Sequence, residues 1–350
     1  MDALLQPILE PWPLWALGLL IAACIVVLGW GADWLVREAV ALSERSGIPK
    51  VVIGATVVSL GTTAPEVAVS VMAAVKGAPE LAMGNAVGSI ICDTGLVLGL
   101  ACLICPLHLP RKIVNRQGWI QFAAGLLLVL ASWPWSDPLS VLTVGGHFSQ
   151  TAGFAFLALL AGYLWLSARW AKRAGDGNLE ELERDVGAPL FLIVGKLLFA
   201  VAVVVIASDM LILAVTIAAE RLGVPTAIIA GTVVAFGTST PELVTGITAA
   251  RRGHGDLAIG NVVGADILNA LFVVGASAAV TPRGLDVTPV FFAWLFPFML
   301  GILVMFRVGI LVSGETLHRG IGALLLGLYA VYVVTSVAGN LGHAAGVALW

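Results

Sequence analysis

The sequence contains 350 residues, of which 59% are hydrophobic and only 11% are charged, and its formal net charge is −3. Its mean hydropathy is +1.02. These values exclude a water-soluble globular domain and indicate a protein whose solvent is a lipid bilayer.

Long apolar segments recur along the whole chain, and each is close to the ~20 residues that an α-helix needs to cross the hydrocarbon core. We therefore expect an all-α integral membrane protein with about ten transmembrane helices. Cysteines in or beside these segments are expected to be small packing residues and not metal ligands. The approximate spans are 13–35, 48–75, 80–105, 117–135, 148–168, 188–218, 224–250, 256–280, 287–306 and 319–339.

The lysines and arginines are distributed unevenly between the predicted loops. The odd-numbered loops hold fourteen of them, whereas the even-numbered loops hold only Lys76, Arg221 and Arg283. Short loops rich in Lys and Arg remain on the cytoplasmic side of a membrane. We therefore expect a multi-pass protein with both termini outside. The lack of a large cytoplasmic regulatory domain is typical of a prokaryotic protein, for which we expect a cell or inner membrane.

The chain contains an internal duplication. A shift of 176 residues aligns 54–99 with 230–275 without a gap, and nineteen of these forty-six positions are identical. Five spans per half is an odd number, so the second half enters the membrane from the opposite side, giving two inverted five-helix repeats. We divide the chain into a first repeat at 1–168, a cytoplasmic linker at 169–187 and a second repeat at 188–350. The aligned Asp33 and Asp209 lie nearer the membrane edges, where we expect structural roles.

Each half contains a proline inside an apolar span, in G-T-T-A-P-E at 61–66 and G-T-S-T-P-E at 237–242. Proline has no N–H and clashes with the carbonyl four residues earlier. We therefore expect Pro65 to free the carbonyl of Gly61, and Pro241 to free that of Gly237. Such free carbonyls can bind a cation near the midplane, where inverted-repeat transporters hold their substrates.

Glu66 and Glu242 lie about mid-span, where an ionised carboxylate costs at least a few kcal/mol. Neither span carries a basic residue near its glutamate. The missing counter-charge must be a bound cation or a proton. Thr62 and Thr63 precede Glu66 by four and three residues, so a continuous helix would place their hydroxyls on its face. The equivalent residues before Glu242 are Thr238 and Ser239.

The third and eighth spans contain G-N-A-V-G-S-I-I-C-D at 84–93 and G-N-V-V-G-A-D-I-L-N at 260–269, whose glycines permit close helix approach. Asp93 and its equivalent Asn269, with Ser89 one turn before Asp93, could join the glutamates in an oxygen-rich site. Such a site suits hard cations such as Ca²⁺ or Na⁺, and the lack of imidazole argues against zinc or copper. For Asn85 and Asn261 we expect helix capping.

At these motifs the sequence resembles the sodium/calcium exchanger family of the cation/calcium antiporter superfamily. The resemblance implies ten helices, alternating access and calcium extrusion coupled to sodium entry. It also implies small inorganic cations and the bilayer as partners, with no cofactor and no nucleic acid. By motif, the family's calcium ligands fall on Glu66, Glu242, Thr62 and Thr238. Its sodium ligands fall on Thr63, Ser239, Ser89 and the carbonyls near Ser59 and Ala235, and its completing acid or amide pair falls on Asp93 and Asn269.

One position departs from the family pattern. In both repeats the family usually has serine directly after the G-N-x-x-G motif, which here spans 84–88 and 260–264. This chain has Ser89 after the first motif but Ala265 after the second. Asp266 stands beside Ala265. The resemblance therefore implies that one sodium site is weakened or rearranged.

Other functions remain open from the residues alone. Glu66, Glu242 and Asp93 together carry up to three negative charges. These charges could be balanced by sodium ions, by one calcium ion with a proton, or by protons alone. The G-T-x-x-P-E form resembles the sodium-coupled branch, so sodium exchange is favoured over proton exchange. Potassium coupling is less favoured still, because Glu242 retains the longer acidic side chain. An intramembrane hydrolase could use a carboxylate pair as acid and base, but no histidine accompanies the glutamates, so the sequence gives it little support. A channel would not need duplicated halves of opposite topology. We expect a secondary transporter and not an enzyme; the oligomeric state stays open.

Overall fold

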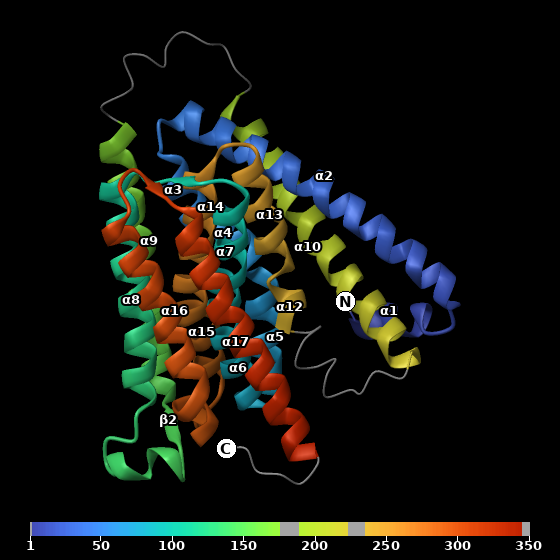
Figure 1. Ribbon diagram of the computed structural model, residues 1–350, viewed down its shortest axis with the longest axis vertical. Coiled ribbons are helices and arrows are strands. Elements are labelled where there is room, and N and C mark those ends of the chain that lie inside the picture. The colour runs from blue at the N-terminus through green and yellow to red at the C-terminus, as the bar shows by residue number, and fades with distance from the viewer. Residues whose placement is uncertain (1, 176–188, 223–234, 345–350) are drawn as a thin grey trace.

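The computed structural model describes residues 2–175, 189–222 and 235–344, and this part of the chain is predominantly helical (Figure 1). The helices of the first half are α1 (Asp2–Leu9), α2 (Leu14–Ser46), α3 (Lys50–Ile53), η1 (Gly54–Val58), α4 (Ser59–Thr62), α5 (Ala64–Val75), α6 (Pro79–Cys92), η2 (Asp93–Val97), α7 (Leu98–Ile104), α8 (Arg111–Ser132), η3 (Pro138–Leu142) and α9 (Gln150–Gly175). Those of the second half are α10 (Leu190–Arg221), α12 (Ala235–Thr238), α13 (Thr240–Arg251), α14 (Gly255–Leu268), η6 (Asn269–Val273), α15 (Val274–Val280), η7 (Phe291–Leu295), α16 (Phe296–Val312) and α17 (Arg319–Ala344). Here η3 is a 3₁₀ turn, and η1, η2, η6 and η7 are π turns.

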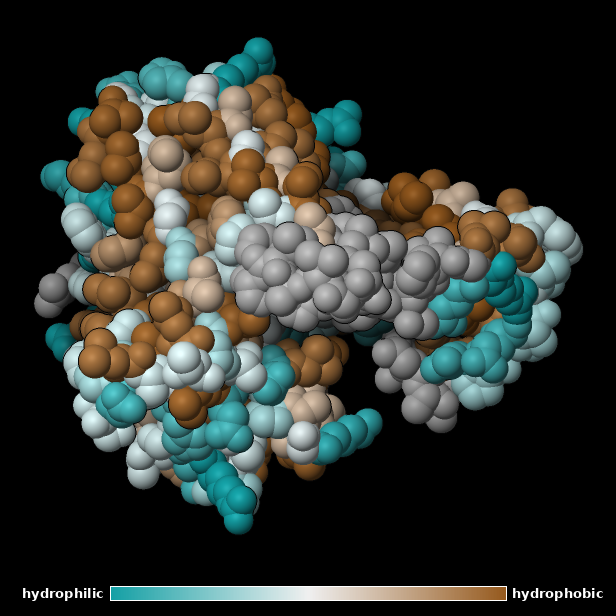
Figure 2. All heavy atoms as spheres, turned by 60° about the horizontal axis from the view of Figure 1, so that its bottom comes forward, coloured by the Kyte–Doolittle hydropathy of each residue, from teal (hydrophilic) through white to brown (hydrophobic). Residues whose placement is uncertain are grey.

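The membrane-spanning helices agree with the predicted all-α architecture. Within the described residues, eight helices are long and apolar enough to cross a bilayer, or nine if the two helical pieces of 50–75, which meet at a bend of 46°, are counted as one span. The predicted span 224–250 begins outside the described residues, and α12 and α13 are its described part. Figure 2 shows wide hydrophobic areas on the sides of the bundle, as expected for a surface in contact with lipid.

Several predicted boundaries were wrong by one or more turns. α2 continues to Ser46, well past the predicted end at 35, and α8 begins at Arg111 instead of 117. Arg307 follows the predicted span 287–306 and was therefore counted among the fourteen basic residues of the odd-numbered loops. It is instead buried in α16, where it donates to the carbonyl and side-chain oxygens of Asn115. Long basic side chains can remain in a helix end when their charged group finds polar partners. The linker predicted at 169–187 begins inside α9, and residues 176–188 lie outside the described residues.

The duplication appears in the helices themselves. The bounds of α5, α6, η2 and α7 recur in α13, α14, η6 and α15 at a shift of 176 residues. α9 packs against α15, and α17 packs in the same way against α7. α2 and α10 lie side by side, tilted away from the other helices (Figure 1). They are antiparallel, because Arg221 donates to the carbonyl of Trp12 while the rings of Trp34 and Phe199 stand 5.2 Å apart. The two halves are therefore inverted repeats.

Two short antiparallel strand pairs join the halves outside the helices. β1 (Leu107–His108) pairs with β4 (Thr316–Leu317), and β2 (Gly146–Phe148) pairs with β3 (Leu285–Val287). Each pair takes one strand from each repeat. The backbone hydrogen bonds therefore connect loops that the sequence alone places far apart.

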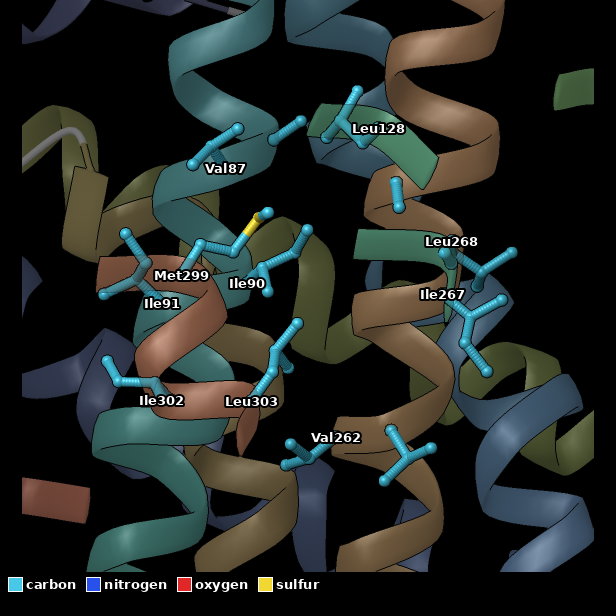
Figure 3. Packing of buried hydrophobic residues seen from close by; sticks show 14 of the residues in the cluster. Val87, Ile90, Ile91, Leu128, Val262, Ile267, Leu268, Met299, Ile302 and Leu303 are labelled. Carbon is cyan, nitrogen blue, oxygen red and sulfur yellow. The ribbon is translucent and has the colours of Figure 1, made fainter. Parts of the chain in front are cut away.

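The central helix α14 is almost completely buried, and most of α6 is buried as well. Their apolar side chains pack with those of α8 and α16, as Figure 3 shows for Ile90 and Ile91 of α6, Ile267 of α14, and Met299 and Leu303 of α16. This apolar packing fixes the two helices on one side. Ser89 of α6 and Asn261 and Asp266 of α14 are also buried, so each needs a hydrogen-bond partner or a bound ion inside the protein.

Candidate functional site

Both proline-containing spans are broken in the structure. α4 ends at Thr62 and α5 begins at Ala64, while α12 ends at Thr238 and α13 begins at Thr240. Pro65 and Pro241 occupy the second position of the new helices, where a backbone N–H has no intrahelical partner to lose. The sequence thus begins a new helix inside each span.

Each break brings two opposite helix ends together. Glu66 and Glu242 lie in the first turns of α5 and α13, and the N-terminal end of a helix stabilises a negative charge. The C-terminal ends of α4 and α12 present carbonyl oxygens, which favour a positive charge. The local geometry therefore supports ionised glutamates beside a bound cation.

The carbonyls at the breaks are more occupied than the sequence predicted. The carbonyl of Gly237, which the proline was expected to deprive of its helical partner, accepts a hydrogen bond from the hydroxyl of Ser208 at 3.4 Å. The carbonyl of Ser59 accepts from the N–H of Thr63 at 2.9 Å and from the hydroxyl of Thr62 at 3.4 Å. Ala235 begins α12, and its side chain lies outside the described part of the chain. A polar side chain from α10 thus replaces the partner that the proline removes at Gly237.

Three carboxylates are fully buried near one another. Glu66, Glu242 and Asp93 have no exposed surface, and the charge of Glu66 interacts with those of the other two. Neither carboxylate oxygen of Glu66 or of Asp93 has a hydrogen-bond partner among the described residues. A buried ionised group without a partner is costly, so these oxygens require a cation or a proton.

The hydroxyl of Thr63 serves the glutamate of the other repeat. It donates to Oε1 of Glu242 at 3.2 Å, and Oε2 of Glu242 has no partner within the described residues. The hydroxyl of Thr62 also lies near this carboxylate. The predicted placement of both hydroxyls on the face of Glu66 assumed a continuous helix, and the break at Thr63 redirects them. Residues of the two repeats therefore share one site.

The two GN asparagines are not helix caps. Asn85 lies inside α6, where it donates to Ser70 at 3.0 Å and accepts from the hydroxyl of Thr238 at 3.3 Å. Asn261 lies inside α14, and neither atom of its amide has a partner among the described residues. The capping prediction failed because glycine before asparagine does not end either helix. Asn85 instead links both repeats beside the glutamates.

The remaining predicted side-chain ligands are buried, and several of their polar atoms have no hydrogen-bond partner among the described residues. Ser89 and Ser239 have unpartnered hydroxyls within the described ranges, and so has the amide of Asn269. Asp93 and Asn269 are the first residues of the π turns η2 and η6. Such turns inside α-helices often occur at functional sites. Equivalent residues thus occupy equivalent irregularities in both repeats.

One carboxylate was not assigned to the site from the sequence. Asp266 of α14 is 2% exposed, and its Oδ2 accepts from the hydroxyl of Thr94 and from the side-chain amide of Gln121, both at 2.5 Å. Its charge interacts with those of Glu242 and Asp93. The sequence feature that could have identified Asp266 as a site residue is an acidic side chain within an apolar span.

The two aspartates near the membrane edges behave differently. Asp33 of α2 accepts from Arg252 at the end of α13, with a distance of 2.8 Å. Asp209 of α10 is close enough for its charge to act on Glu66.

Within the described ranges, no three Cys, His, Asp or Glu side chains form a group that could hold a metal ion by themselves. The oxygens gathered at the site are of mixed type, from carboxylates, hydroxyls and amides.

Comparisons with known proteins agree with this arrangement. The profile of the family described as sodium/calcium exchanger protein matches residues 16–169 and 192–338. The inner membrane protein YrbG of Escherichia coli is 35% identical over 329 residues, which cover 91% of this chain and 95% of YrbG. The sodium/calcium exchanger MaX1 of Methanosarcina acetivorans is 30% identical over 340 residues, which cover 89% and 95% of the two chains.

A solved structure shows the same fold. The sodium-calcium exchanger NCX_Mj, soaked with 10 mM Na⁺ and zero Ca²⁺, superposes with a TM-score of 0.76 at 23% identity, covering 92% of this chain and 99% of that one. The family profile accounts for most of the chain and includes both broken spans with their glutamates. This protein is a member of the sodium/calcium exchanger family, a family of membrane cation antiporters.

Proposed function

We propose that this protein exchanges Ca²⁺ for Na⁺ across the membrane by alternating access. The observation that carries the proposal is the pair of buried glutamates, Glu66 with both oxygens unpartnered in the described structure and Glu242 with one. Carboxylate, hydroxyl and amide oxygens are the ligands that Ca²⁺ and Na⁺ prefer. The name of the relative MaX1, a sodium/calcium exchanger, supports the same pair of ions.

The proposed calcium ligands are Glu66 and Glu242 with Thr62 and Thr238. The proposed sodium ligands are Thr63, Ser239, Ser89 and the carbonyls near Ser59 and Ala235. Asp93 and Asn269 complete the centre. Both ions would share the glutamates, so occupation by one ion excludes the other. This competition is what an exchanger requires in order to couple two opposite fluxes.

The inverted repeats provide a physical basis for alternating access. The two halves would form the same site from opposite sides, so rearrangement of one set of helices against the other would open it to either face. We further propose a cell or inner membrane with both termini outside, a first repeat at 1–168 and a second at 188–350. No cofactor is part of the proposed cycle.

Calcium/proton exchange is the second candidate. It is favoured by Asp93, which is buried, has no described partner and lies among other acidic residues. A proton could satisfy this carboxylate as well as a cation could. The coupling ion is therefore the point that experiment must decide.

The deciding experiment is calcium uptake into proteoliposomes under separately imposed sodium, potassium and proton gradients. We expect an outward sodium gradient alone to drive saturable calcium uptake. Uptake driven by a proton gradient but not by sodium would establish the second candidate. Non-saturating flux without any counter-ion would contradict both and indicate a channel.

A further inference from the structure

The carboxylate of Asp266 has two oxygens in different situations. Oδ2 accepts from the hydroxyl of Thr94 and the amide of Gln121, and the same amide lies 3.0 Å from the Thr94 hydroxyl. Oδ1 is buried and has no hydrogen-bond partner among the described residues. The carboxyl group is therefore held in a fixed position by one oxygen while the other remains free.

This arrangement is not repeated at the positions related to it by the duplication. The position equivalent to Asp266 is Ile90, which packs in the apolar cluster of Figure 3. The position equivalent to Thr94 is Ala270, which belongs to the same cluster. A polar group of three residues, drawn from both repeats, thus occupies one of two symmetry-related places, and at the other place the residues equivalent to Asp266 and Thr94 are apolar. Burial of such a group carries a cost unless the group has a partner.

The surroundings of Asp266 are acidic and contain no described compensating base. The charges that act on it and its neighbours come from Glu242, Asp93 and Glu66, and its direct partners Thr94 and Gln121 are neutral. Both partners present hydrogen-bond donors to Oδ2, which suits an ionised carboxylate acting as acceptor. An ionised carboxylate in this place needs a positive charge at Oδ1.

Asp266 also stands next to the position where the second repeat lacks a hydroxyl. Ser89 offers a free hydroxyl in the first repeat, and its equivalent Ala265 offers none. The neighbouring Asp266 brings an oxygen into the same part of the second repeat. Resting on the proposed sodium/calcium exchange, we propose that Asp266 is a further cation ligand whose Oδ1 binds a sodium ion beside the centre formed by Glu66, Glu242 and Asp93.

The added carboxylate changes the charge that the site can hold. With Asp266 the site contains four acidic side chains instead of three, so it can hold one more monovalent cation at the same net charge. Thr94 and Gln121 act as positioning residues, because they contact only the oxygen that the ion does not use. Their loss would leave the charge in place and weaken its orientation.

The test is equilibrium binding of radioactive ²²Na⁺ to purified protein in detergent, at two pH values, with ⁴⁵Ca²⁺ binding measured in parallel. Asp266→Asn keeps the shape and removes the charge. We expect it to bind one sodium ion fewer, or to need at least about tenfold more sodium for half-saturation, while calcium affinity changes much less. Wild-type protein that binds no sodium would overturn the proposed function and this inference together.

Matched controls on α8 separate positioning from folding. Gln121→Met and Gln117→Met alter the same buried residue type one turn apart, and only Gln121 contacts Asp266. We expect Gln121→Met to weaken sodium binding and Gln117→Met to leave it unchanged, with both proteins monodisperse. If wild type binds sodium and Asp266→Asn binds the same number with the same affinity, the inference alone is wrong. Unchanged sodium binding with a flattened pH dependence would instead make Asp266 a proton carrier.

Discussion

At the scale of single residues, the two glutamates are placed by backbone geometry as much as by side-chain contacts. Each lies in the first turn of the helix that begins after a break, so the positive N-terminal end of that helix stabilises its carboxylate. The negative charge is thereby supported without a basic partner, which would compete with a transported cation. A lysine or arginine here would neutralise the glutamates permanently.

The first prediction concerns these charges. Glu66→Gln and Glu242→Gln should each reduce calcium uptake into proteoliposomes to the level of empty vesicles, because the amide keeps the shape and loses the charge that binds the ion. Gel filtration and thermal unfolding in detergent should show folded protein. Near-normal uptake by either variant would remove that glutamate from the site.

Ala265 gives a prediction with the opposite sign. Ala265→Ser introduces the hydroxyl that Ser89 supplies in the other repeat, and the residue is fully buried in α14. We expect the sodium concentration for half-maximal exchange to fall by roughly two- to tenfold, as one added polar contact would give. Calcium affinity should change little. An unchanged sodium dependence would mean that another oxygen already fills this position.

Substitution of Asp93 tests whether its carboxyl group is protonated or ionised during transport. Its equivalent in the second repeat is Asn269, so one half already works with a neutral amide. We therefore expect Asp93→Asn to preserve sodium-driven calcium uptake and to flatten the dependence of that uptake on pH. Loss of sodium-driven uptake in this variant would show that Asp93 is an obligatory charged ligand.

The residues of the site were more predictable than their contacts. Glu66, Glu242 and Asp93 stand out in the sequence because acids inside apolar spans are rare. The bond from Thr63 to Glu242 could not be predicted, since it depends on how the two repeats meet. The role of Asn85 was missed for the same reason, because its partners Ser70 and Thr238 lie on other helices.

At the scale of helices, α14 packs closely against the first half of the broken span, which consists of α3, η1 and α4. A Cβ atom on Gly260 would lie 2.3 Å from the carbonyl oxygen of Val51, and one on Gly264 would lie 2.6 Å from the hydroxyl of Ser59. Helices in membranes approach this closely only where small residues remove side chains from the contact. The glycines of the second GN motif therefore hold α14 against the first half of the broken span.

Gly260→Ala should be among the most damaging small substitutions in the chain. The added methyl group meets backbone atoms, which cannot move aside as a side chain could, so we expect a loss of about 1–3 kcal/mol or more of stability. Gly301→Ala in α16 is the matched control, because no described heavy atom lies within 4 Å of its added Cβ. Equal melting temperatures of the two variants in detergent would contradict the close packing.

At the scale of the whole molecule, the inverted repeats were predictable because their evidence is a pattern of many residues. The alignment at a shift of 176 and the odd number of spans per half require opposite directions, and the antiparallel α2 and α10 agree. Helix ends were less predictable. Arg307 is charged and was expected in a loop, but it lies within α16. There its guanidinium donates a hydrogen bond to Asn115 and stacks over the ring of Trp119.

The orientation of the molecule in the membrane gives the last prediction. Lys112 and Ser136 are exposed at opposite ends of α8, and the distribution of basic residues places Lys112 in the cytoplasm and Ser136 outside. Of the native cysteines, Cys24, Cys92 and Cys102 are buried, so replacing Cys105 with serine should give a low labelling background. In that background, Ser136→Cys should react with a membrane-impermeant maleimide on intact cells. Lys112→Cys should react only after the membrane is permeabilised, and the reverse pattern would place both termini inside.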